Sequence, residues 1–193
     1  MRFEVINRMS SSAAAVEVPW TEPGGEAFLD LRNDAGAISR IGAARENPPL
    51  AALIVSVNGD ASLFSTTRAK TWSAAAQGNG EDGAAEFGSR VELVLADPKL
   101  RENSAMTEDA VRRLVELWMK ESGADTLSAR LEVLPCRLGA AAAKGAAIRI
   151  SLSARGETPE QARMRWGLGV ARLQQALLFV SRAMRVKLGI ERS

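Results

Sequence analysis

The chain has 193 residues, of which 46% are hydrophobic and 25% are charged, and its formal net charge is +2. This length and composition are ordinary for a globular domain with a hydrophobic core. The sequence contains no histidine, no tyrosine and a single cysteine, Cys136. It therefore excludes histidine-dependent catalytic triads, the common zinc sites and an internal disulfide. We expect no bound cofactor, and these absences favour a non-catalytic protein over an enzyme.

The N-terminal residues carry charges at Arg2 and Glu4 and lead into no long apolar run. This is unlike a secretory signal, and no segment reaches the ~18 consecutive apolar residues that a membrane-spanning helix requires. We therefore expect a cytoplasmic protein with no membrane span. The high content of alanine, arginine and glycine is typical of a GC-rich genome and indicates a bacterial source.

The first quarter of the chain contains only short predicted elements. These are extended segments at 3–6, 15–20 and 27–31 and a helix at 35–44, capped by Asn33 or Asp34. Residues 50–57 form a nearly continuous apolar run of strand length, which predicts a central strand covered on both faces. Asn58 and Gly59 are the favoured pair for a tight hairpin turn, so the alternating segment 62–74 is predicted to be the returning strand.

An acidic, glycine-rich stretch at residues 76–86 is the best candidate for an internal boundary. It would separate a first unit, residues 1–75, from a second, residues 87–193. The elements predicted beyond it are strands at 87–96, 127–134 and 147–155, a helix capped by Thr107, and a long helix at 158–188.

This order predicts one α+β domain over residues 1–193, in which helices pack on one face of a mixed or antiparallel sheet. Ferredoxin-like units, each a split β-α-β arrangement, are one way to build it. The long C-terminal helix has the clearest local signals. Thr158, Pro159 and Gln161 form a capping box at its start, and Gly189 stands where a C-terminal cap glycine belongs.

The C-terminal helix carries two apolar rows. The first has the spacing of a coiled-coil seam and is the predicted oligomer interface: Trp166, Val170, Leu173, Leu177, Val180 and Met184. The second covers much of the far side: Met164, Leu168, Ala171, Leu178, Phe179 and Val186. A helix that is apolar on two sides must pack on both, so we expect one row to cover the sheet and the other to meet a second copy of the chain. The alternatives are a single large core that encloses the helix, and a peripheral membrane helix held by its arginines.

The predicted strand at 62–74 has a mixed face on which Phe64, Thr66, Arg68, Lys70 and Trp72 alternate with smaller residues. Cations interleaved with aromatic rings on a sheet can hold single-stranded nucleic acid, since bases stack on the rings and phosphates meet the cations. The alternative is a half-covered face, in which the aromatic rings pack at the ends and the charged side chains extend to solvent between them.

Other motifs favour structural roles. Residues 78–83 match the G-x-G-x-x-G pattern, but a strand follows them and two acidic residues would repel phosphate. The lysine of residues 139–145 precedes its glycine, which is not a phosphate-binding loop. The carboxylates that follow predicted elements are interpreted as caps or surface groups: Asp30, Asp34, Asp60 and Asp97. Cys136 ends an apolar run and is predicted to be a buried, inert thiol.

Three functional hypotheses remain. The first is a non-catalytic protein that self-associates through its C-terminal helix and serves as an assembly or ligand-binding subunit, with the ligand unknown. The second is a single-stranded nucleic-acid-binding module that uses Arg68, Lys70 and Trp72 together with the arginines of the C-terminal helix. The third is a histidine-independent enzyme with a carboxylate-based site.

Overall fold

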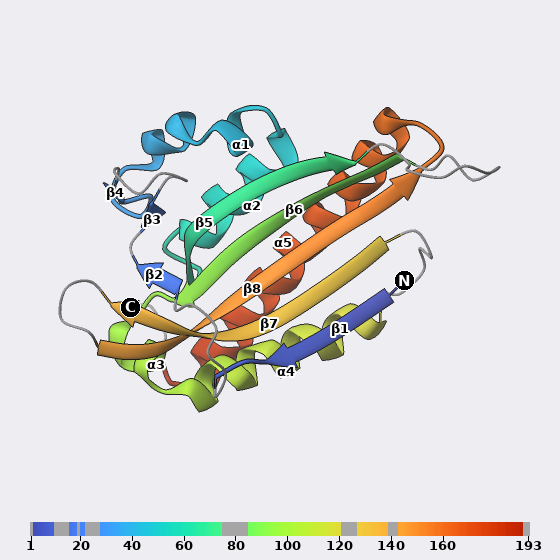
Figure 1. The fold of residues 1–193 in the computed structure, drawn as a ribbon. Helices are drawn as coiled ribbons and strands as arrows, with labels where there is room; N and C mark the ends of the chain where they lie inside the picture. The colour runs from blue at the N-terminus through green and yellow to red at the C-terminus, as the bar shows by residue number, and fades with distance from the viewer. Residues whose placement is uncertain are drawn as a thin grey trace.

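The computed structural model describes residues 2–9, 16–18, 20–21, 28–74, 85–120, 127–138 and 143–190. It consists of a six-stranded sheet with helices packed on one face (Figure 1). The predicted α+β fold is confirmed. The main elements are β1 (Arg2–Asn7), β2 (Val16–Val18), α2 (Pro48–Asn58), β5 (Phe64–Ala74), β6 (Ala85–Leu95), α4 (Ser104–Lys120), β7 (Leu127–Leu138), β8 (Ala143–Gly156) and α5 (Pro159–Lys187). Smaller elements are β3 (Trp20–Thr21), β4 (Phe28–Leu29), η1 (Ala35–Arg40), α1 (Gly42–Arg45) and α3 (Pro98–Glu102).

The strand order in the sheet is β1-β7-β8-β6-β5. β1 and β2 both pair with β7 in parallel, β1 with residues 128–133 and β2 with residues 136–138. The other neighbouring strands of this sheet are antiparallel. Both β6 and β7 are antiparallel to β8, which lies between them, so β6, α4 and β7 form one split β-α-β unit. β5 and β6 flank the predicted boundary at 76–86 and pair with each other along most of their length. Residues 75–84 lie outside the described residues.

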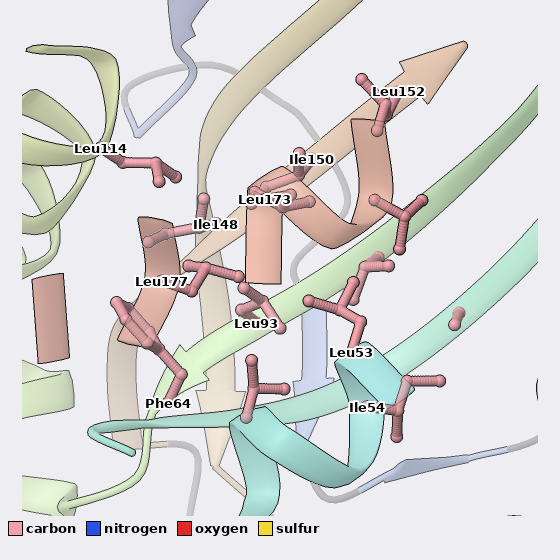
Figure 2. Packing of buried hydrophobic residues seen from close by; sticks show 14 of the residues in the cluster. Leu53, Ile54, Phe64, Leu93, Leu114, Ile148, Ile150, Leu152, Leu173 and Leu177 are labelled. Carbon is pink, nitrogen blue, oxygen red and sulfur yellow. The ribbon is translucent and has the colours of Figure 1, made fainter. Parts of the chain in front are cut away.

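The hydrophobic core lies between the sheet and helices α2, α4 and α5 (Figure 2). In the close-up, Leu173 and Leu177 of α5 point toward Ile148 and Ile150 of β8. α2 and α4 close the two sides of this layer with their own apolar residues. Helices α2, α4 and α5 thus cover one face of the sheet. On the opposite face, α3 lies against the end of β8 at Gly145, where a Cβ would lie 2.9 Å from the carbonyl oxygen of Arg101.

Helix α5 begins and ends where its local signals predict. The Thr158 side chain accepts a hydrogen bond from the Gln161 backbone N–H at 3.2 Å, and the Gln161 side chain accepts one from the Glu157 N–H at 2.7 Å. Gly189 has a φ of 65°, the left-handed conformation that glycine adopts without strain. Both ends depend only on residues within one turn, which explains why they could be predicted.

The predicted strand at 50–57 is wrong, because these residues form helix α2. Pro48 and Pro49 occupy the first helical positions, where a missing N–H costs nothing. The buried residues Leu50, Leu53, Ile54 and Val57 recur at helical spacing. An apolar run buried in a helical layer has the same composition as a central strand, so composition alone cannot separate the two.

The predicted hairpin turn at Asn58-Gly59 is the end of α2 instead. The Asn58 side chain is buried, donates to the carbonyl of Ile54 and the hydroxyl of Thr66, and accepts from the Thr66 backbone N–H. Asn58 therefore joins the end of α2 to the start of β5. Two further boundaries differ: α4 begins at Ser104, with Thr107 buried inside it, and the predicted helix at 35–44 is split between η1 and α1.

A β-bulge in β5 changes which residues share a face. The pairing with β6 shifts between Thr66 and Arg68, so that Thr67 is the extra residue. Phe64 consequently faces the helices and is 1% exposed, whereas Arg68 and the alternating residues after it face away from them. The prediction that Phe64 shares a face with Arg68, Lys70 and Trp72 is therefore wrong, since strict alternation fails at the bulge.

Candidate functional site

The sheet face opposite the helices, here called the open face, is polar over most of its area. The register of the strands places its side chains in rows that run across the sheet. One row contains Arg68, Glu92, Arg149 and Glu132; the next contains Lys70, Arg90, Ser151, Arg130 and Glu4; a third contains Trp72, Gly88, Ser153, Ser128 and Arg2. Beyond the first row, this face ends in a small cluster of buried residues that are apolar: Val16, Val94, Leu134, Cys136 and Ala147.

The carboxylates of the open face are all paired with arginines. Glu92 accepts from Arg149 Nε at 2.8 Å, and Arg149 also lies 4.0 Å from Glu132, which accepts from Arg8 Nε at 2.7 Å. At the edge of the sheet, Glu4 accepts from Arg130 Nε at 2.6 Å.

Glu86 is likewise paired, since it lies 3.6 Å from Arg155. Four other cations of the open face take no part in these ion pairs: Arg2, Arg68, Lys70 and Arg90. None of them has a carboxylate partner among the described residues. Together they give this face an excess of positive charge, although the whole chain is close to neutral.

A shallow trough of about 600 Å³ crosses the middle of the open face. Its floor is made of small residues, among them Ser128, Ser151 and Ser153, and its rim carries larger side chains, including Trp72 and Arg90. A smaller hollow of about 210 Å³ lies beside it, between Arg68, Lys70, Arg90, Glu92 and Arg149. The Arg90 Nε donates to the Ser151 hydroxyl at 3.3 Å, and the Arg90 side chain lines both hollows.

Gly88 determines where the indole of Trp72 lies. The two residues are direct cross-strand partners, and a Cβ built on Gly88 would lie 2.4 Å from Trp72 Cζ2 and 3.0 Å from the Cβ of Ser153. The indole therefore occupies the space that a side chain at position 88 would need. It is half-buried, so part of the ring stays accessible beside the serine floor of the trough.

The structure brings together the three residues predicted to contact nucleic acid. Arg68, Lys70 and Trp72 follow one another on the open face of β5 after the bulge. The sequence alone does not single out the rest of the surface, above all Arg90, Ser151 and Ser153. The available signal was the polar half of the alternation in 86–92, 128–132 and 149–153, which faces away from the apolar half.

The two apolar rows of α5 differ in their environment. Every residue of the first row is buried within this chain, with an exposed fraction of 2% or less: Trp166, Val170, Leu173, Leu177, Val180 and Met184. The Trp166 indole N–H also donates to the Ser89 hydroxyl of β6 at 3.0 Å. The surface of α5 that remains available to a partner is the second row, where Met164, Leu168, Phe179 and Val186 are each about 60% exposed.

The other candidate residues do not converge on a site. Asp30 and Asp97 accept hydrogen bonds from backbone N–H groups two or three residues ahead, which is a local capping role. Within the described ranges no three carboxylate or cysteine side chains are grouped so that they could hold a metal ion. Residues 78–83 and 139–142 lie outside these ranges.

Cys136 is 1% exposed, and burial raises the pKa of its thiol, so the prediction that it is buried is confirmed.

In the part of the chain that the structure describes, no helix has the length and apolar character needed to span a membrane.

Comparison with known proteins yields no relative. No protein-family model matches the chain, and neither a curated protein sequence nor a solved structure matches it.

Proposed function

We propose that the protein binds single-stranded nucleic acid on its open sheet face. The observation that carries this proposal is the set of unpaired cations that lies beside a half-buried tryptophan: Arg2, Arg68, Lys70 and Arg90 around Trp72. Phosphates pair with such cations, and a base stacks on an aromatic ring whatever its sequence.

The size of the face fits a short length of a single strand. The five strands span about 19 Å at ~4.8 Å per strand. Over that distance a single strand presents roughly three to five phosphates, which is comparable to the set of unpaired cations. The hydroxyls of Ser128, Ser151 and Ser153 lie between the cations and add hydrogen-bond donors to the floor.

A single strand fits this surface better than a duplex does. The trough is shallow and its aromatic ring lies at the level of the sheet, where it can stack only on bases that are not already paired. The ion pairs of Arg149 with Glu92 and Glu132 link neighbouring strands of the first row and add no net charge to the face.

The direct test is fluorescence anisotropy of a labelled oligothymidine titrated with the protein at low salt, with a duplex of the same length as competitor. We expect binding that weakens steeply as salt is added, and a single-stranded competitor that displaces the probe better than the duplex. Absence of binding at low salt, or equal competition by the duplex, would overturn the proposal.

A further inference from the structure

The exposed side of α5 carries a stripe with an internal symmetry. Its residues are Met164, Leu168, Ala171, Gln175, Phe179, Arg182 and Val186, here called the outer stripe. Their spacings are four, three, four, four, three and four, so they lie on one face of the helix. This series reads the same in both directions from Gln175, which stands at its centre.

We infer that two copies of the chain pair through their outer stripes, with the two α5 helices antiparallel around a two-fold axis at Gln175. In this register Ala171 meets Phe179 of the partner subunit, and Met164 meets the partner's Val186. Leu168 meets the stem of the partner's Arg182. The Ala171–Phe179 pair places a small residue against a large one on each side of the axis, and every contact occurs twice, as a two-fold interface requires.

A groove beside the stripe supports this register. It has a volume of about 660 Å³ and lies between α2 and the N-terminal half of α5, lined mainly by apolar residues that include Pro48, Ala52, Gly167 and Ala171. Gly167 allows α2 to approach closely, since a Cβ there would lie 3.3 Å from Pro49 Cγ. The two-fold axis brings the partner's Phe179 to the end of this groove where Ala171 lies, so that a protruding ring meets a hollow.

The area that pairing would bury is sufficient for an interface of moderate strength. Met164, Leu168, Phe179 and Val186 are 63%, 62%, 59% and 64% exposed. Side chains of this size then expose on the order of 100 Å² each, so two copies remove roughly 800 Å² from these residues alone. The groove residues and the stem of Arg182 add to this and bring the total to the ~1,200 Å² at the lower limit of specific interfaces.

The charges of α5 determine how such a dimer responds to salt. No carboxylate follows Glu160 in α5, and pairing brings Arg172 and Arg182 of both copies to one contact region. Salt screens this repulsion, so dimerisation strengthens as ionic strength rises. Nucleic-acid binding by the open face has the opposite dependence, so the two properties can be tested separately.

Pairing through the helix layer would also determine what the dimer presents. The helices of both copies would form the interior, and the two open faces would lie on opposite outer sides, away from each other. Such a dimer can hold two separate strands at once, which goes beyond binding by a single chain.

The test combines light scattering with cysteine cross-linking. We expect the wild-type protein to change from monomer to dimer between low and high micromolar concentration, with the change shifted to lower concentration at higher salt. Phe179→Arg should weaken dimerisation about tenfold or more, since it places a charge in an apolar contact. Val5→Arg is the matched control, because Val5 is 47% exposed on the edge strand β1, and it should leave the mass unchanged.

Cross-linking tests the register. Under mild oxidation, Gln175→Cys should form a disulfide-linked dimer, because position 175 lies on the axis. Met164→Cys should not, because two antiparallel copies of position 164 lie about 33 Å apart at 1.5 Å per residue. The wild type, whose Cys136 is buried, is the background control.

Several results would overturn the inference. One is a protein that stays monomeric at high micromolar concentration and high salt; another is a Met164→Cys variant that cross-links as readily as Gln175→Cys. A monomer that binds vesicles of anionic lipid, or an acidic amphipathic peptide, through the outer stripe would likewise contradict a second copy as the occupant. Loss of nucleic-acid binding in Arg68→Ala would leave this inference standing.

Discussion

Removing Arg68 and Lys70 together should reduce the salt dependence of nucleic-acid binding by about half. Both side chains are exposed on β5 and have no carboxylate partner among the described residues, so the double variant Arg68→Ala, Lys70→Ala breaks no ion pair. Both lie at the solvent side of the sheet, and we expect the variant to fold with the stability of the wild type.

The magnitude follows from the number of phosphates neutralised. With four unpaired cations on the open face, the logarithm of the affinity should fall with the logarithm of salt with a slope of about −2.8, at about −0.7 per phosphate of a single strand. Two remaining cations give a slope of about −1.4. Between 50 and 200 mM salt, the wild type should therefore lose about 50-fold in affinity and the double variant about 7-fold.

The assay is anisotropy of a labelled oligothymidine over a series of salt concentrations. Arg40→Ala combined with Arg45→Ala is the control, since it removes the same charge from two exposed residues that lie outside both the open face and the outer stripe. The control should keep the wild-type slope. If the double variant keeps that slope as well, or if the control loses as much of it, the open face is not where the phosphates lie.

Three further predictions follow from the same structure. Trp72→Ala should weaken binding of a single strand about 5- to 150-fold while leaving the salt slope unchanged, because stacking on the indole is lost and no charge is removed; titration at several salt concentrations checks both. Leu177→Ala should lower the free energy of unfolding by about 2–5 kcal/mol in urea melts at every protein concentration, because this residue is 1% exposed in the core of one chain; a change that appears only where dimers form would contradict its place in the core. Burial opposes ionisation of Asp109, but hydrogen bonds from Arg112, Arg113 and Lys187 outweigh it and hold its pKa at about 2, below the ordinary 3.8. Its ionised form thus stabilises the fold above about pH 4, and this contribution is lost as the pH falls toward 2. Asp109→Asn should reduce the change of the urea midpoint with pH between about pH 4 and pH 2. An unchanged pH profile of the midpoint would exclude this role for Asp109.

The sequence could predict those parts of the fold that depend on neighbours along the chain. The start and end of α5 follow from Thr158, Gln161 and Gly189, which act within one turn. The strands with clear alternation, such as β7 and β8, were predicted for the same reason. The helices on one face of the sheet followed from the order of these elements.

The elements that the sequence could not predict depend on tertiary contacts. The apolar run of α2 reads equally well as a strand, and only its burial against the sheet and α5 makes it a helix. The bulge at Thr67 has no signature in the local sequence. Because of it, Phe64 points into the core whereas Arg68 points toward the open face.

The candidate site combines both kinds of information. Arg68, Lys70 and Trp72 lie on one strand, and their alternation was visible in the sequence. Their neighbours Arg90 and Ser151 come from β6 and β8, and they join the site only because these strands pair in this order and register. No spacing along the chain encodes that register, which is determined by the packing of the sheet against its helices.

The most direct test of the central claim is to map where a bound strand touches the protein. Ultraviolet cross-linking of an oligothymidine, followed by mass spectrometry of the peptides, reports the contact residues. Binding on the open face predicts cross-links within residues 68–72, with further sites on β6 and β8 at residues 88–90 and 151–153. Cross-links confined to the arginines and apolar residues of α5, between 163 and 187, would contradict it.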